Sequence, residues 1–239
     1  MILPGGEIHL WCARLSADPA EHDLLQQTLS ADERERAARF RFEQHRNAFV
    51  TARGMLRRIL SWYTGTPPEA LAFVYGDRGK PALPDSGFHF NLSHSGDLAL
   101  YALARESRLG VDIEHIHRVA DAEGIAKRFF SAGEYSALMA LDPAQREQAF
   151  FRCWTRKESY IKALGDGLAA PLDGFQVALI PGQPACFIEI DGDPQAAREW
   201  SLFDLTPAEG YVAAIAAYGR EWRLRQPAPE LDQTALLVF

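Results

Sequence analysis

The 239-residue sequence has few cysteines, no long apolar run and no excess of positive charge. Its three cysteines, Cys12, Cys153 and Cys186, form neither a metal-binding spacing nor a disulfide framework, which favours a reducing cytoplasm. The longest apolar runs are too short to span a bilayer, and the first residues lack a charged-then-apolar signal region. A net charge of −7 argues against general nucleic-acid binding. We therefore expect a cytoplasmic protein that binds neither membranes nor nucleic acid.

The apolar content is 47%, enough at this length to bury one large domain or two packed halves. Two stretches, 88–104 and 200–218, each read as a strand, a polar turn and an alanine-rich return strand. This pattern predicts an internal repeat with a ligand cleft at the junction, because ligands often bind between domains. We predict an N-terminal half at 1–106, a C-terminal half at 107–224 and a tail at 225–239.

Residues 150–165 read as an amphipathic helix closed by a glycine. Phe150, Trp154 and Ile161 mark its apolar stripe, Lys157 falls within the stripe, and Glu158 lies on its edge. Charged side chains aimed at apolar surroundings require a partner, a metal or a charged ligand. The alternative is a snorkelling lysine and an ordinary Glu158 to Lys162 pair one turn apart.

A strand at 109–114 places Asp112 and Glu114 on one face, because these acids alternate with Val111 and Ile113. Two such carboxylates repel each other unless water solvates them or a cation bridges them. A divalent ion such as Mg²⁺ takes oxygen ligands of this kind. On its own, the pair is more often a solvated sheet face.

Three further segments are candidates for binding phosphate. A helix at 43–63 carries Arg46 and Arg53 away from its apolar side, and arginine suits oxyanions because its donors are forked. Gly79-Lys80-Pro81 forms a turn with a positive charge, and Ser93-His94 ends a strand in a small polar turn. The alternatives are a solvated helix surface and ordinary turns.

Five motifs together resemble one family. They are Gly79-Lys80-Pro81, Asn91-Leu92-Ser93-His94-Ser95, Gly110-Val111-Asp112-Ile113-Glu114, Phe129-Phe130-Ser131-Ala132-Gly133-Glu134-Tyr135, and Trp154-Thr155-Arg156-Lys157-Glu158-Ser159-Tyr160-Ile161-Lys162. The set is similar to the 4'-phosphopantetheinyl transferases of the larger, surfactin-synthetase-activating (Sfp) type. The resemblance extends from about residue 8 to about residue 220, and its motifs are weak singly but specific as a set.

The resemblance implies an α+β fold of two similar halves related by a pseudo-twofold, with coenzyme A in the cleft between them. It implies a monomeric enzyme that transfers the 4'-phosphopantetheine arm of coenzyme A to a serine of an apo acyl or peptidyl carrier protein. The competing hypothesis is a non-catalytic protein of the same fold that binds coenzyme A or a carrier.

The resemblance also implies roles for single residues. Mg²⁺ would be held by Asp112, Glu114 and Glu158, and the catalytic residues would be Glu158, Lys162 and Asp112. Glu158 is the candidate base, either directly or through water on the metal, and the role of Glu134 stays open. The coenzyme would contact Arg46, Arg53, Gly79, Lys80, Pro81, Ser93, His94 and Lys157.

Overall fold

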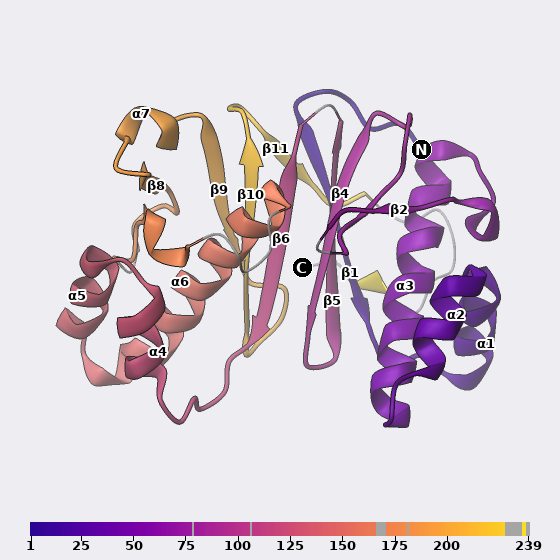
Figure 1. Cartoon of the computed structure of the whole chain (residues 1–239), viewed down its shortest axis with the longest axis horizontal. Coiled ribbons are helices and arrows are strands. Elements are labelled where there is room, and N and C mark those ends of the chain that lie inside the picture. Colours follow the sequence, from indigo (N-terminus) through magenta and orange to yellow (C-terminus); the bar gives the residue numbers. More distant parts are fainter. Residues whose placement is uncertain (78, 106, 166–170, 181, 228–235, 238–239) are drawn as a thin grey trace.

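The computed structural model describes the chain except residues 78, 106, 166–170, 181, 228–235 and 238–239. Two α+β halves lie side by side, with the strands central and the long helices on the outer flanks (Figure 1). No helix among the described residues is long and apolar enough to cross a membrane.

The first half begins with a strand, continues through three helices and ends in a hairpin. Its elements are β1 (Glu7–Arg14), α1 (Pro19–Thr28), α2 (Ala31–Ala38), α3 (Glu43–Thr64), a 3-10 turn (Pro68–Ala70), β2 (Val74–Tyr75), β3 (Pro81–Ala82), β4 (Phe88–Ser95) and β5 (Leu98–Arg105). Ser30 and Glu33 form a capping box that fixes where α2 begins.

The second half repeats this order with more irregular connections. It contains β6 (Leu109–His115), α4 (Ala122–Phe129), α5 (Ala132–Ala140), α6 (Pro143–Leu164), a 3-10 turn (Leu172–Gly174), β7 (Phe175–Val177), β8 (Phe187–Ile190), α7 (Pro194–Ala197), β9 (Trp200–Leu205) and β10 (Tyr211–Tyr218). Helix α6 starts at Pro143, well before the predicted residue 150, because Asp142 caps it and proline suits the first turn.

The order of strands shows the repeat directly. The first half has β1-β5-β4 and the second β6-β10-β9, so each half places its last strand between its first and its next-to-last. The longest helices, α3 and α6, are each 22 residues long and each end at a glycine with positive φ, Gly65 and Gly165. This confirms the predicted α+β fold of two similar halves.

The C-terminal residues include two short strands. Strand β11 (Arg223–Arg225) pairs in parallel with β1, and β12 (Leu236–Leu237) pairs with it antiparallel, so both extend the sheet of the first half. Residues 228–235 and 238–239 of the predicted tail lie outside the described part of the chain. The open edge of β1 explains the pairing, since an edge strand presents unpaired backbone groups.

The apolar core has a part in each half and a third part that joins them. In the joining part, Ile8 and Leu10 of β1 lie in one buried cluster with Val111 and Ile113 of β6 and Ile215 of β10. All five side chains are almost completely buried. This shared cluster fixes the two sheets relative to each other and thereby sets the width of the cleft above them.

Candidate active site

A cavity of about 340 Å³ lies between the halves. The first half contributes helix residues, the 79–81 turn and part of β4, while the second contributes the last turns of α6. The residues lining the cavity are Arg36, Phe49, Ala52, Arg53, Gly79, Lys80, Pro81, Asn91, Leu92, His94, Glu158, Ile161, Lys162 and Gly165. Most of the predicted coenzyme and catalytic residues therefore meet in one place.

Helix α6 can reach the acidic strand because Gly110 has no side chain. A Cβ atom at Gly110 would lie 2.1 Å from the Ser159 carbonyl oxygen and 2.4 Å from the Ala163 nitrogen. Such distances are not possible, so only glycine lets α6 lie against β6 here. This contact places Lys162 close enough to donate a hydrogen bond to Asp112.

Two carboxylates beside the cleft have a buried oxygen atom without a partner. Asp112 is 3% exposed, and its Oδ1 accepts hydrogen bonds from Ser93 Oγ at 2.9 Å and from Lys162 Nζ at 2.5 Å. Asp112 Oδ2 and Glu158 Oε1 are both buried and have no hydrogen-bond partner among the described residues. Glu114 Oε2 accepts from Ser95 Oγ at 2.7 Å. The unsatisfied oxygens require an explanation, because burying such groups is costly.

The electrostatics show how crowded these acids are. Burial, together with the charges of Asp112 and Glu114 and against the opposing charge of Lys162, raises the pKa of Glu158 to about 7. Burial also raises the pKa of Asp112, against the opposing effects of Lys162 and Ser93, and burial raises that of Glu114. A cation among these oxygens would offset both the repulsion and the missing hydrogen bonds. Among the described residues, no group of three or more His, Cys, Asp or Glu side chains is already arranged so that it could hold a metal ion.

The first half contributes basic residues to the cleft, Arg36 and Arg53. Arg53 is 7% exposed, and its buried Nη1 has no hydrogen-bond partner in the described part of the chain. Its Nε lies 3.6 Å from Glu33 Oε1, and its guanidinium carbon lies within 6 Å of the ring centres of Phe49, Phe73 and Tyr75. Arg53 is thus held in place with one donor nitrogen unused, as an anion-binding group requires.

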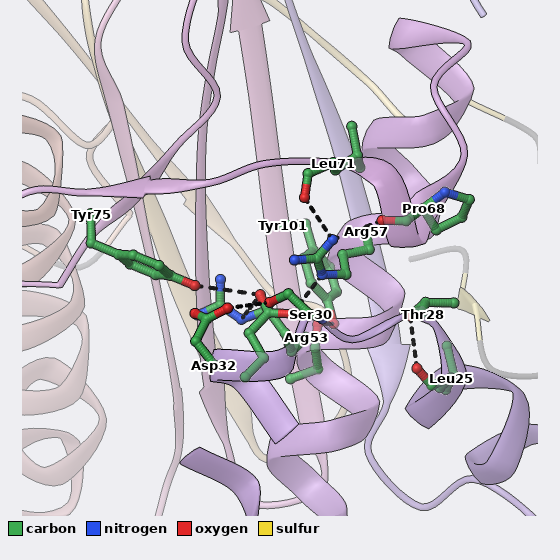
Figure 2. Close-up of polar contacts among 12 residues, drawn as sticks. Leu25, Thr28, Ser30, Asp32, Arg53, Arg57, Pro68, Leu71, Tyr75 and Tyr101 are labelled. Atoms are coloured by element: carbon green, nitrogen blue, oxygen red, sulfur yellow. Dashed lines mark hydrogen bonds and ion pairs between the residues drawn. The ribbon is translucent and has the colours of Figure 1, made fainter. Parts of the chain in front are cut away.

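Arg57 lies one turn further along α3 and is a structural residue. Its Nε donates to Glu33 Oε2 at 2.6 Å. Its Nη1 donates to the carbonyl oxygens of Pro68 and Leu71 at 2.8 and 2.9 Å (Figure 2). These bonds connect α2, α3 and the segment that leads toward the 79–81 turn. Glu33 therefore fixes Arg57 directly and also faces Arg53.

Comparison with known proteins decides the family. Residues 15–106 match the family model described as 4'-phosphopantetheinyl transferase, N-terminal, and residues 108–216 match the 4'-phosphopantetheinyl transferase superfamily. The 4'-phosphopantetheinyl transferase HetI of Nostoc is 44% identical over 229 residues, covering 93% of this chain and 92% of HetI. The chain belongs to the 4'-phosphopantetheinyl transferases.

Further relatives support the Sfp type. A 4'-phosphopantetheinyl transferase of Bacillus subtilis is 38% identical over 162 residues, covering 66% of this chain and 70% of that protein. The transferase Sfp of Bacillus subtilis strain 168 is 34% identical over 160 residues, with the same coverage. The chain is thus an enzyme that transfers phosphopantetheine to carrier proteins.

In this transferase, Lys157 does not lie in the cleft, and the prediction that it binds coenzyme A is wrong. Its side chain is fully buried, and Nζ donates to Glu134 Oε1 and to the Phe175 carbonyl oxygen, both at 2.7 Å. The ammonium nitrogen also lies 4.1 Å from the Phe175 ring centre. Neighbouring helix residues point about 100° apart, so Glu158 faces the cleft and Lys157 faces the core of the second half.

The position of Glu134 answers the question that the sequence left open. Glu134 is 1% exposed, and its Oε2 accepts from the Ser131 amide in the capping box of α5. Its Oε1 accepts from Lys157 Nζ and from the Val177 amide at 2.8 Å. Glu134 therefore joins α5, α6 and β7 and is a structural residue.

Arg46 of the transferase also lies away from the cleft, contrary to the prediction. Its side chain is 43% exposed, its Nη2 lies 3.8 Å from Glu43 Oε1, and it borders a separate small cavity beside α1 and α2. Arg36, which lines the cleft, was missed by sequence reasoning. Its helix is so rich in charge that every charged residue on it resembles a solvated surface residue, and the sequence contains no signal that separates Arg36 from its neighbours.

Lys80 and His94 both line the cleft of the transferase. Lys80 Nζ donates to the carbonyl oxygens of Leu109 and Lys162 at 3.1 and 2.5 Å, and burial lowers its pKa to about 8. Partial burial lowers the pKa of His94, and the charge of Lys162 lowers it further. Lys80 thereby ties the turn of the first half to the end of α6.

Proposed function

We propose that the cleft binds Mg²⁺ and coenzyme A and transfers the 4'-phosphopantetheine arm to a serine of an apo acyl or peptidyl carrier protein. The observation that carries this proposal is the pair of buried oxygens, Asp112 Oδ2 and Glu158 Oε1, that have no hydrogen-bond partner among the described residues. Glu158 lines the same cavity as Arg53, and Lys162, which also lines it, donates to Asp112. A site with acids on one side and cations on the other suits a metal-bound pyrophosphate that continues into a second phosphate group.

Asp112, Glu114 and Glu158 fit an oxygen-binding divalent ion and would hold Mg²⁺ together with phosphate oxygens and water. When bound, the ion supplies positive charge that neutralises the acids and the pyrophosphate. Lys162 already performs part of this task, since it donates to Asp112 Oδ1 and to Ser93 Oγ. Lys162 is therefore positioned between the acidic strand and the expected phosphates.

The coenzyme would lie along the basic side of the cleft. Arg53 and Arg36 would bind the nucleotide end, and His94 and Lys80 would bind the pyrophosphate. An ammonium group has three donors, and Lys80 uses two of them on backbone carbonyls, so one stays available. Gly79 and Pro81 would shape the turn that approaches the coenzyme. Ser93 belongs to the acidic side, because its hydroxyl is already engaged with Asp112 and Lys162.

In the reaction, the carrier serine oxygen forms a bond to the β-phosphorus of coenzyme A. The bond from that phosphorus to the bridging oxygen breaks, and 3',5'-ADP leaves with the electron pair. Glu158 would accept the serine proton as the general base. Lys162 stabilises the leaving phosphate. As in other phosphoryl transfers, alignment and charge stabilisation supply most of the catalysis.

Mass spectrometry of an apo carrier protein tests the proposal. After incubation with the enzyme, coenzyme A and Mg²⁺, the carrier should gain one phosphopantetheine arm, and the gain should disappear when a chelator is added. Tight coenzyme binding without any transfer, across a panel of carriers from fatty-acid, polyketide and nonribosomal-peptide synthesis, would instead support a non-catalytic binding protein.

The three cysteines form no disulfide, which agrees with a cytoplasmic location. This location and a monomeric state stay predictions.

A further inference from the structure

Strands β4 and β6 come from different halves and belong to different sheets, yet three side chains of β4 join them. Asn91, Ser93 and Ser95 are spaced by two residues, so they share one face of β4. Asn91 Oδ1 accepts from the Val111 amide at 2.8 Å. The two serines donate to the two acids of β6. The join between the halves therefore coincides with the acidic end of the cleft.

The hydrogen bonds of Ser95 have a defined direction. Its Oγ accepts from the His115 amide at 3.1 Å, and an amide can only donate. The single hydroxyl proton is therefore directed to Glu114 Oε2 at 2.7 Å. Ser93 repeats the arrangement, because its Oγ accepts from Lys162 Nζ at 2.8 Å and donates to Asp112 Oδ1. Each serine occupies one carboxylate oxygen and leaves the other for a ligand.

We propose that Ser95 is a positioning residue of the metal site, which holds Glu114 in the orientation that binds the cation. This inference rests on the proposed function. Asp112 is fixed by Ser93 and Lys162 together, whereas Ser95 alone among the described residues donates a side-chain hydrogen bond to Glu114. Glu114 is also only half-buried and lies one residue before the end of β6. Without the Ser95 hydroxyl, its longer side chain would sample several rotamers.

The test measures binding of Mn²⁺ alone to the full-length protein by electron paramagnetic resonance, without coenzyme. Removing a group that orients a metal ligand typically weakens metal binding by about 10- to 100-fold, which we expect for Ser95→Ala. Ser95→Thr keeps the hydroxyl and should restore most of the affinity. The matched control is Ser86→Ala, because Ser86 also accepts from an amide (Phe88) and donates to a carbonyl (Leu83), but away from the acids.

Thermal unfolding of each variant verifies that it folds. The inference is overturned if Ser95→Ala binds Mn²⁺ as tightly as the parent protein while Glu114→Gln binds it more weakly; the proposed metal site would then stand without Ser95. If Glu114→Gln also leaves the affinity unchanged, Glu114 is not a ligand, and both the inference and that part of the proposed function fail. If Ser95→Ala weakens Mn²⁺ binding and Ser95→Thr weakens it equally, the hydroxyl is not responsible for the affinity. That result would also contradict the inference.

Discussion

Replacing Lys157 with methionine should destabilise the enzyme without directly affecting coenzyme binding. Lys157 and Glu134 are both fully buried at the side chain, 2.7 Å apart, and the same ammonium group also satisfies the Phe175 carbonyl. Lys157→Met removes the cation and leaves a carboxylate buried in the core. Removing one partner of a buried ion pair costs about 3 to 5 kcal/mol. For a chain of this size, that loss corresponds to a decrease in Tm of roughly 6 to 20 °C.

The assay is thermal unfolding of four proteins, the parent, Lys157→Met, Glu134→Gln and the double variant, together with the KM for coenzyme A. The double variant should be less destabilised than the sum of the single variants, because the second change removes the group that the first left unpaired. Lys162→Met is the matched comparison, since Lys162 is 29% exposed and lies in the cleft. It should lower activity strongly and stability less than Lys157→Met does, because Ser93 still donates to Asp112 after the change. A Lys157→Met protein with unchanged Tm and a raised KM for coenzyme A would refute this reasoning.

Further predictions concern the cleft. If Glu158 is both metal ligand and base, the kcat of Glu158→Gln should stay about 10² to 10⁴ lower even at saturating Mg²⁺. Asp112→Asn should recover more of its rate as the Mg²⁺ concentration is raised, because Asp112 is a ligand only. Full rescue of Glu158→Gln by magnesium would exclude the base role. His94→Ala and Arg36→Ala should each raise the KM for coenzyme A by about ten- to a hundredfold, the effect of one lost charged hydrogen bond, with kcat changed less. Steady-state kinetics with varied coenzyme measures both effects, and an unchanged KM in both variants would place the coenzyme elsewhere.

The duplicated fold has one acidic site, and the side chains explain why. Trp11 pairs with the fourth residue of β5, and Asp112 pairs with the fourth residue of β10, so the two occupy equivalent positions. The equivalent of Lys162 near the end of α6 is Trp62 near the end of α3. The ring centres of Trp11 and Trp62 lie 5.0 Å apart. At the equivalent position of the second half, Lys162 donates a hydrogen bond to Asp112. Two indole rings thus fill the first half's counterpart of the site.

The same comparison accounts for Lys157. Glu33 and Glu134 are each the third residue of a helix with a capping box, and each accepts from the fifteenth residue of the following long helix, Arg57 or Lys157. The sequence pattern placed Lys157 correctly in the buried stripe of α6. Its partner lies 23 residues away on another helix, and the pattern of a single helix contains no information about that contact.

Other parts of the structure were accessible from the sequence for local reasons. The alternation of Asp112 and Glu114 with apolar residues requires a strand with both acids on one face, and the structure has that strand. The 79–81 turn and His94 were recognisable from turn residues. By contrast, β11 and β12 are three and two residues long, and such short strands have no period to detect. Their position depends on the free edge of β1, which exists only in the folded protein.

The most direct test of the account is anomalous diffraction from a crystal grown with coenzyme A and Mn²⁺ in place of Mg²⁺. The account predicts one anomalous peak at the acidic end of the cleft, within about 2 to 2.3 Å of oxygens from Asp112, Glu114 and Glu158 and of the coenzyme pyrophosphate. A peak that contacts only the phosphates, or that lies away from these three carboxylates, would contradict it.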